Sequence, residues 1–376
     1  MMRVAIVHDD FIQHGGAEKL VLAMLEIYPE ADLYAVSASD QWRREIKDLF
    51  NKDIRTTWIK NLPLRHRYFR FYYTFYPLAV ESFNFDGYDL VVSSSARYAH
   101  GIITKPSTVH VSYVNSPARF LWEDNLIPQD LLAQPIIRWQ KAWDTVASQR
   151  PDYLIANSKA PARKIEKYWG RKVDAVIYPF VDLEKFIAVD SIGMSHELVE
   201  GSIPLGNKGY FLIVSRLNEW KRLDIAVETF TKINLPLYII GDGSERENLE
   251  KMAGPSVKFL GCVSDGGKIN YLRHCRALIV PQAEDFGIVI LEANACGRPV
   301  IAYKGGGSLE LISEEVNGLF FSEQQVASLM HALKRFDQIQ FNRENCLKAA
   351  KRFTKNRFKK ALGGFVQSKM SFRQNY

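Results

Sequence analysis

Short, uninterrupted apolar segments recur along the chain and restrict its fold more than any other feature of the sequence. They alternate with amphipathic stretches and lack the polar–apolar alternation of a half-exposed strand. Each predicted strand should therefore be covered on both faces, as in a parallel sheet flanked by helices. The pattern predicts an α/β protein with two doubly wound sheets in series. The predicted strands are residues 3–8, 31–37, 89–93, 108–114, 153–157 and 174–178, followed by 210–215, 236–240, 257–261, 276–280 and 299–303.

The length of 376 residues also favours two domains, because single hydrophobic cores stop growing beyond about 250–300 residues. Residues 187–208 combine Gly, Ser and Pro with weak periodicity and are interpreted as the linker. We therefore expect an N-terminal domain over residues 1–190 and a second domain over residues 205–352. Residues 353–376 are basic and helical in period, and this helix follows the last predicted strand of the second domain.

Charge and cysteine usage limit the partners and the compartment. The formal charge is +7, which favours anionic partners such as phosphates or acidic lipids. The positive charge is dispersed and no known nucleic-acid-binding module occurs, so nucleic acid is not an expected partner. The absence of a C-x-x-C pair and of an 18-residue apolar run predicts buried thiols in a cytoplasmic protein without a membrane span. The cysteines are Cys262, Cys275, Cys296 and Cys346.

Gly15 and Gly16 stand between the first predicted strand and a helix-like segment. Paired glycines allow a ligand to approach the backbone closely, and the N-terminus of a helix offers unpaired N–H groups to an anion. A tight turn that needs positive φ would explain the two glycines equally well.

Arg216 and Lys221 follow the first strand of the second domain. Two cations five residues apart beyond a strand could clasp a diphosphate from two sides. A solvated surface pair is the alternative. Further along, Glu284 and Glu292 are separated by seven residues, with Gly287 between them where a ligand could reach the backbone. The run Lys304 to Ser308 contains three glycines and opens another helix, so these segments together suit a phosphorylated, polyhydroxylated ligand.

Several stretches in both halves of the sequence resemble a known protein family. The stretch EDFGIVILEANACGRPVIAYKGGGSLEL, preceded by SRLNEWKRLD and IIGDGSE, is similar to the nucleotide-sugar half of retaining family-four glycosyltransferases. The segments VHDDFIQHGGAEK, SSSARYAHGIITKPSTVHVSYVNSPARFLWE and NSKAPARKIEKYWGRKVDAVIYPFVD resemble bacterial polysaccharide mannosyltransferases of that family. The resemblance implies the GT-B fold, with two facing Rossmann-like domains and a C-terminal helix that returns to the N-terminal domain.

The resemblance also implies roles for individual residues. The expected donor-binding residues are Gly15, Gly16, Arg216, Lys221, Gly261, Val263, Glu284, Phe286, Gly287, Ile288 and Glu292. Glu284 would hold hydroxyls of the donor sugar and Glu292 the ribose, while backbone groups near Gly261 and Val263 would contact the base. Arg216 and Lys221 would neutralise the diphosphate and so act, with Glu284, on the transition state. Glu284 is not assigned as a nucleophile, because transferases of this family resemble a same-face exchange.

One position departs from the family pattern. Asn115 stands where many relatives have a catalytic His, and an amide cannot serve as a general base. His100 is the better candidate among the nearby histidines, since His110 lies upstream on a predicted strand. Asn115 and Arg119 are expected to bind the acceptor.

Residues 64–77 read LRHRYFRFYYTFYP and mix Arg with aromatic side chains. Such a segment suits peripheral contact with an anionic membrane, at the cytoplasmic face of the inner membrane. A helix packed in the core of the N-terminal domain would explain the same composition.

The sequence thus predicts transfer of a hexose, first mannose, from a nucleotide sugar to a glycan or lipid-linked acceptor in cell-surface polysaccharide synthesis. The expected donor is GDP-mannose, with UDP-sugars next, and no cofactor or metal is expected because no D-x-D motif occurs. A noncatalytic nucleotide-sugar-binding protein or an epimerase of the same fold is the alternative. A dehydrogenase is disfavoured, because the Gly241–Gly243 turn lacks the third glycine of G-x-G-x-x-G.

Overall fold

A computed structural model describes residues 2–62, 72–123, 133–187 and 209–374 of the chain. It divides into two units, of which the first comprises Met1–Pro179 with Asn356–Tyr376 and the second comprises Phe180–Lys355. The first unit thus ends at Pro179, whereas the sequence placed the boundary at residue 190. Apart from residue 187, the predicted linker lies outside the described residues.

The first unit is built on a seven-stranded parallel sheet in the order β3-β2-β1-β4-β5-β6-β7. All eight residues of the central strand β1 are buried, as expected for a parallel sheet covered on both faces. The strands are β1 (Val4–Phe11), β2 (Asp32–Ala38), β3 (Ile54–Thr56), β4 (Leu90–Ser95), β5 (Val109–Val114), β6 (Tyr153–Ala156) and β7 (Ala175–Val176).

Helices of the first unit begin and end at recognisable signals. The Ser39 hydroxyl accepts a hydrogen bond from Trp42 N at the start of α2, and Asn51, with φ of 52°, ends that helix in the left-handed region. The helices are α1 (Gly16–Ile27), α2 (Asp40–Phe50), η1 (Trp58–Asn61), η2 (Tyr73–Phe75), α4 (Tyr76–Glu81), η3 (Ala99–Gly101), α5 (Arg119–Trp122), α6 (Gln134–Ala147) and α7 (Lys159–Trp169).

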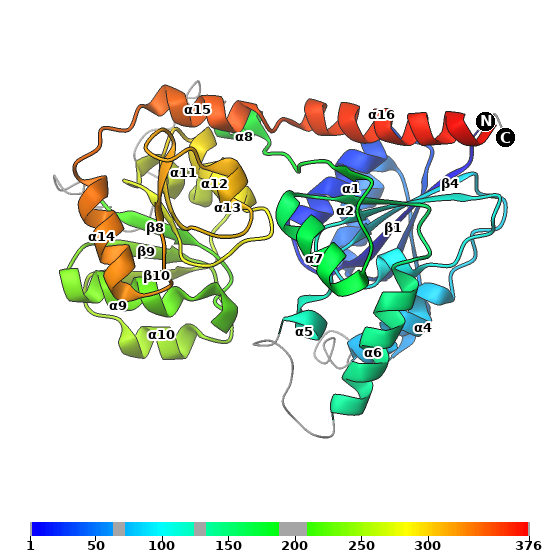
Figure 1. Ribbon diagram of the computed structural model, residues 1–376, viewed down its shortest axis with the longest axis horizontal. Coiled ribbons are helices and arrows are strands. Elements are labelled where there is room, and N and C mark those ends of the chain that lie inside the picture. Colours follow the sequence, from blue (N-terminus) through cyan, green and yellow to red (C-terminus); the bar gives the residue numbers. More distant parts are fainter. Residues whose placement is uncertain (1, 63–71, 124–132, 188–208, 375–376) are drawn as a thin grey trace. The chain divides into compact units, whose positions relative to one another are not determined.

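The basic C-terminal helix α16 (Lys355–Gln374) packs on the first unit, although it follows the second unit in sequence (Figure 1). Lys359 Nζ lies 3.0 Å from Glu26 Oε2 at the end of α1. The ring of Phe358 meets Tyr113 of β5 edge-on, with centroids 5.8 Å apart. The chain therefore returns to its N-terminal unit, as the family resemblance implied.

The second unit contains a six-stranded parallel sheet in the order β10-β9-β8-β11-β12-β13. Its strands are β8 (Phe211–Val214), β9 (Leu237–Ile240), β10 (Val257–Gly261), β11 (Leu278–Val280), β12 (Val300–Tyr303) and β13 (Gly318–Phe321). Its helices are α8 (Leu183–Ile187), η5 (Glu219–Lys221), α9 (Leu223–Ile233), α10 (Arg246–Met252), α11 (Asp265–His274), α12 (Ile288–Ala295), α13 (Ser308–Leu311), α14 (Val326–Phe336) and α15 (Arg343–Lys351).

All the strands predicted from apolar runs are present, and the predicted fold class is confirmed. The sequence missed β3 and β13, two edge strands of three and four residues. Three of the cysteines are buried free thiols as predicted, whereas Cys262 is exposed.

The segment predicted to contact a membrane, residues 64–77, lies in part outside the described residues, because the structure describes none of residues 63–71. Its remaining aromatic side chains pack against the core of the first unit, and Tyr76 is only 1% exposed. Residues 72–77 therefore agree with the alternative prediction, in which the aromatic side chains pack in the core of the N-terminal domain. In the described part of the chain, no helix is both long enough and apolar enough to cross a membrane.

Candidate functional site

The loops that follow β8, β9 and β10 meet at the carboxyl ends of the second sheet. Gly241 N donates a hydrogen bond of 2.8 Å to Gly261 O, which joins the loops after β9 and β10. Gly241 has φ of 129°, and a Cβ atom there would clash with the Ser215 carbonyl. Only glycine at position 241 therefore allows the loop that contains the exposed Arg216 to pack this closely against it. The packing brings Arg216 to the same edge of the sheet as Gly261 and Val263.

Lys221 and Glu284 come together at this edge, although 63 residues separate them in sequence. Lys221 Nζ lies 2.5 Å from Glu284 Oε1, and the two side chains are 10% and 14% exposed. Gln282 also donates to Glu284, and the Lys221 ammonium lies 4.1 Å from the centroid of the Trp220 ring. The predicted phosphate-binding cation and the predicted sugar-binding acid therefore form an ion pair.

Glycines also shape the loops after β11 and β12. Gly307 N donates a hydrogen bond of 2.7 Å to Glu284 O, and a Cβ atom on Gly306 would clash with the same carbonyl. Gly287, with φ of 99°, ends the loop from β11 and begins α12, whose first residue is Ile288. Phe286 is buried beneath this loop. The backbone of the predicted donor-binding residues is thus fixed by contacts that no residue with a Cβ could make.

Glu292 lies on α12 and pairs with a lysine that sequence reasoning missed. Lys268 Nζ on α11 lies 2.8 Å and 3.0 Å from the two Glu292 carboxylate oxygens. The side chains are 16% and 8% exposed. No local signal marks Lys268, because the pair joins two helices 24 residues apart in sequence. Glu284 and Glu292 therefore each have a lysine partner of their own.

In the first unit, the turn of Gly15 and Gly16 opens α1. Gly15 has φ of −126°, and neither glycine is in the left-handed region, so a turn requiring positive φ does not explain them. Gly15 N donates to Glu18 Oε2 at 3.0 Å, which forms one half of a capping box. These two glycines lie in the first unit and the other predicted donor residues in the second, so their common role stays a prediction.

Three consecutive polar residues lie near the end of β1, and the predicted strand, residues 3–8, included only the first of them. His8, Asp9 and Asp10 are 2%, 0% and 1% exposed, and burying such groups is costly unless each is paired. The two oxygens of Asp9 accept hydrogen bonds from four backbone N–H groups, those of Ala96, Arg97, Tyr98 and Ala99, over 2.5 to 2.9 Å. Asp9 therefore fixes the loop that leaves β4.

His8 links β1 to the turn at Gly15. Its Nδ1 lies 3.0 Å from Ser94 O, and its side chain also bonds to Glu18. Burial alone would lower the pKa of His8, but the hydrogen bond and charge of Glu18, with the charges of Asp9 and Asp10, raise it above its usual value. For Glu18, burial works against ionisation, yet the hydrogen bond with His8 and its charge lower the pKa of the carboxyl. The contact between His8 and Glu18 therefore links β1 to the turn at Gly15.

The structure corrects the assignment of His100 as a catalytic residue. His100 is 0% exposed and lies between Ser95 Oγ, 3.1 Å from its Nδ1, and Asp144 Oδ1, 3.2 Å from its Nε2. Its ring also stacks at a tilt on Trp169, with centroids 4.5 Å apart. A residue enclosed in the core cannot take a proton from an acceptor, so His100 is a structural residue.

The predicted acceptor residues have protein partners. Asn115 is half-buried at the end of β5, and its amide nitrogen donates to Ser94 Oγ at 3.3 Å. Arg119 Nε lies 2.9 Å from Glu123 Oε1, which also accepts from Lys164 at 2.7 Å. The structure places Asn115 directly after the carboxyl end of β5, whereas Arg119 belongs to an ion-pair cluster with Glu123 and Lys164.

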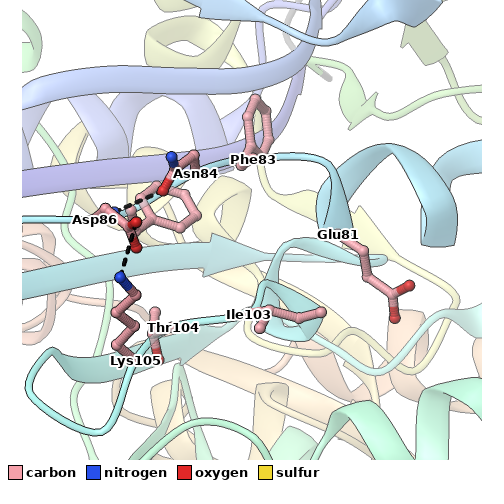
Figure 2. A pocket seen from close by; sticks show the side chains of 8 residues that line it. Glu81, Phe83, Asn84, Asp86, Ile103, Thr104 and Lys105 are labelled. Carbon is pink, nitrogen blue, oxygen red and sulfur yellow. Dashed lines mark hydrogen bonds and ion pairs between the residues drawn. The ribbon is translucent and has the colours of Figure 1, made fainter.

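A pocket of about 230 Å³ lies elsewhere in the first unit, lined in part by Phe83, Ile103 and Thr104 (Figure 2). Two of its polar side chains pair with each other, since Lys105 Nζ lies 2.8 Å from Asp86 Oδ2. The lining residues precede β4 and β5, so the pocket lies near the amino ends of these strands. Parallel α/β sheets bind ligands at the opposite edge, which separates this pocket from the candidate site.

Comparison with solved structures defines the class of fold. The Anabaena protein Alr3699/HepE, crystallised in complex with UDP, matches with a TM-score of 0.68 at 17% identity over 98% of this chain and 100% of that chain. Sucrose-phosphate synthase from Thermosynechococcus elongatus matches with a TM-score of 0.72 at 15% identity over 99% of this chain and 100% of that one. The chain has the GT-B fold of glycosyltransferases.

The sequence of the second unit matches a known family. Residues 198–354 match the family described as "Glycosyl transferases group 1". Human alpha-1,3/1,6-mannosyltransferase ALG2 is 31% identical over 185 residues, 43% of either chain. The O-antigen chain mannosyltransferase C of Escherichia coli is 25% identical over 213 residues, 54% of this chain and 53% of the relative. The matches thus span about half the length of these curated relatives.

Proposed function

We propose that the chain is a retaining glycosyltransferase that moves a hexose, first mannose, from a nucleotide sugar to a glycan or lipid-linked saccharide. The observation that carries this proposal is the Lys221–Glu284 pair at the carboxyl ends of the second sheet. It joins a cation and an acid beside loops shaped by glycines, within the segment that matches the glycosyltransferase family. The named mannosyltransferases among the relatives support mannose as the sugar.

The proposed chemistry follows from where charge develops. As the bond between the sugar and the diphosphate breaks, the leaving phosphate gains negative charge, which Lys221 and Arg216 would stabilise. Glu284 would then exchange its bond with Lys221 for the hydroxyls of the donor sugar. Lys268 holds Glu292 in place, where its carboxylate can accept from the ribose. The proposal assigns the departing phosphate, rather than a protein carboxylate, the removal of the acceptor proton, and it requires no metal ion or cofactor.

Nucleotide sugars should raise the melting temperature of the protein, since a ligand that binds only the folded state stabilises it. At 100 times the dissociation constant the gain is about 2.7 kcal/mol. We expect GDP-mannose to give the largest shift in a thermal-shift panel of GDP, UDP and ADP sugars, with UDP-sugars next. A shift with UDP-sugars alone would remove GDP-mannose as the donor, and no shift with any of them would remove the proposal.

Asn115 gives specific support to a second candidate, a nucleotide-sugar-binding protein without transferase activity. An amide stands where a general base is common in the family, and His100 is buried. An epimerase of the same fold is the other alternative. Release of free nucleotide only in the presence of a saccharide acceptor identifies a transferase, whereas binding without turnover identifies the noncatalytic protein.

Contact with an anionic membrane remains a proposal that rests on the composition of residues 64–77. Cationic side chains attract anionic lipid, and each contributes about 1 kcal/mol near the surface. The triple variant Arg65→Ala, Arg67→Ala, Arg70→Ala is expected to float with anionic liposomes less than the wild-type protein does. Equal flotation of both would remove the membrane proposal and leave the transferase proposal intact.

A further inference from the structure

The first sheet has a topological switch point between β1 and β4. From β1 the chain moves outward to β2 and β3, and it then crosses back to β4 on the other side of β1. Ligands of open α/β sheets bind beyond the carboxyl ends of the two strands at such a point. The residues that follow these strands are the turn of Gly15 and Gly16 after β1, and Ala96 and Arg97 after β4.

Arg97 is held rigidly at this switch point. Its backbone N–H donates to Asp9 at 2.9 Å, and its guanidinium pairs with the buried Asp10. The guanidinium also lies 5.0 Å from the centroid of the Tyr73 ring. Its side chain is nevertheless 19% exposed, so part of it reaches solvent. Sequence reasoning did not single out Arg97, because its acidic partners Asp9 and Asp10 are 88 and 87 residues distant.

The charges around Arg97 favour a neutral ligand over an anion. The Arg97 guanidinium lies among three acidic side chains, those of Asp9, Asp10 and Glu18. The local charge is therefore not positive, which disfavours a free phosphate. A hydroxyl group fits better, because the guanidinium can donate to its oxygen.

Asn115 offers a complementary acceptor at the next strand end. Its amide nitrogen is used by Ser94 Oγ at 3.3 Å, so its side-chain oxygen can accept from a hydroxyl. β4 and β5 are neighbours in the sheet, and Asn115 N donates to Ser95 O at 2.7 Å. A donor and an acceptor on adjacent strand ends suit the vicinal hydroxyls of a sugar.

We propose that Arg97, held by Asp10 at the switch point of the first sheet, binds a hydroxyl group of the saccharide acceptor. This inference rests on the proposed glycosyltransferase function and deepens it. In this proposal Arg97 donates to the hydroxyl oxygen and Asn115 accepts from a neighbouring hydroxyl.

The test measures binding of simple glycosides to the full chain by saturation-transfer NMR. The probes are the methyl glycosides of mannose, glucose, galactose and N-acetylglucosamine. We expect at least one to bind the wild-type protein, and its affinity to fall about tenfold to hundredfold in Arg97→Gln, which removes a hydrogen bond from a charged donor. The matched control is Arg55→Gln. Arg55 pairs with Asp32 at 3.0 Å near the amino ends of the same sheet, so this variant should bind like the wild type.

Each outcome decides the inference. Binding of none of the glycosides by the wild type, or equal binding by wild type and Arg97→Gln, would overturn it. Competition by inorganic phosphate together with normal binding in Arg97→Lys would also overturn it, because the ligand would then be an anion. Thermal shifts with GDP-mannose are recorded on the same samples. A shift retained in Arg97→Gln separates loss of the acceptor site from failure of the transferase proposal, which would abolish the shift in the wild type as well.

Discussion

Replacing Glu284 or Lys221 with alanine is expected to lower kcat/KM for nucleotide-sugar turnover by about a hundredfold to a thousandfold. The two side chains form an ion pair, with Lys221 Nζ 2.5 Å from Glu284 Oε1. With donor bound, Lys221 would turn its charge to the diphosphate and Glu284 to the sugar. Each variant thus removes an interaction that strengthens as the bond to phosphate breaks. The measurement is steady-state release of nucleotide with saturating acceptor.

The matched control for these variants is Glu228→Ala on α9. Glu228 forms an ion pair of 2.6 Å with Lys232 in the same unit, but both side chains are exposed. It should leave the rate unchanged, because an exposed pair contributes little to stability and is not at the carboxyl edge of the sheet. Circular dichroism should show that the site variants remain folded. Near-normal rates in both Glu284→Ala and Lys221→Ala would disprove the site assignment.

Asp9→Ala is expected to destabilise the protein by about 3–5 kcal/mol at neutral pH. The substitution removes the acceptor for four backbone N–H groups at once and leaves Arg97 with fewer counter-charges in a buried position. A buried N–H group without an acceptor destabilises the folded state by more than its hydrogen bond had stabilised it, because the group has lost its hydrogen bonds with water and gained none in the protein. Urea unfolding at pH 7 measures the loss. Asp53→Ala, which alters an exposed carboxylate, should leave the free energy of unfolding unchanged.

The contribution of Asp9 should depend on pH. Burial would raise the pKa of this carboxyl, but the charges of Arg97 and His8 and the backbone donors lower it below its usual value of 3.8. A depressed folded-state pKa means that the stabilisation is complete above the unfolded-state pKa and is lost as the pH falls through the folded-state value. The difference in unfolding free energy between wild type and Asp9→Ala should therefore shrink below about pH 4. A difference that stays constant down to pH 2 would contradict this account of Asp9.

The sheet strands could be predicted because a strand that is buried on both faces consists of consecutive apolar residues. That same signal failed where buried residues are polar. The first predicted strand ended at His8, yet β1 continues to Phe11 through Asp9 and Asp10. Hydrogen bonds from partners some 87 residues away stabilise these buried carboxylates, and no local pattern can reveal such partners.

The sequence predicted those parts of the site that residues close together in the chain form, and it missed contacts between distant segments. The glycines at positions 287, 306 and 307 mark loops whose geometry excludes a Cβ atom, and their spacing is visible in the sequence. The partner of Glu292 was not visible, since Lys268 approaches it from a different helix. His100 was misassigned because the sequence shows only that it follows a strand end. It does not show that Asp144 and Trp169, which are distant in sequence, enclose the side chain.

A crystal structure of the chain with GDP-mannose tests the central proposal most directly. We expect the diphosphate within hydrogen-bonding distance of Arg216 and Lys221, with Lys221 released from Glu284 and the ribose against Glu292. A nucleotide sugar bound at the amino ends of the strands, or a Lys221–Glu284 pair that remains closed while the donor is bound elsewhere, would contradict the proposal.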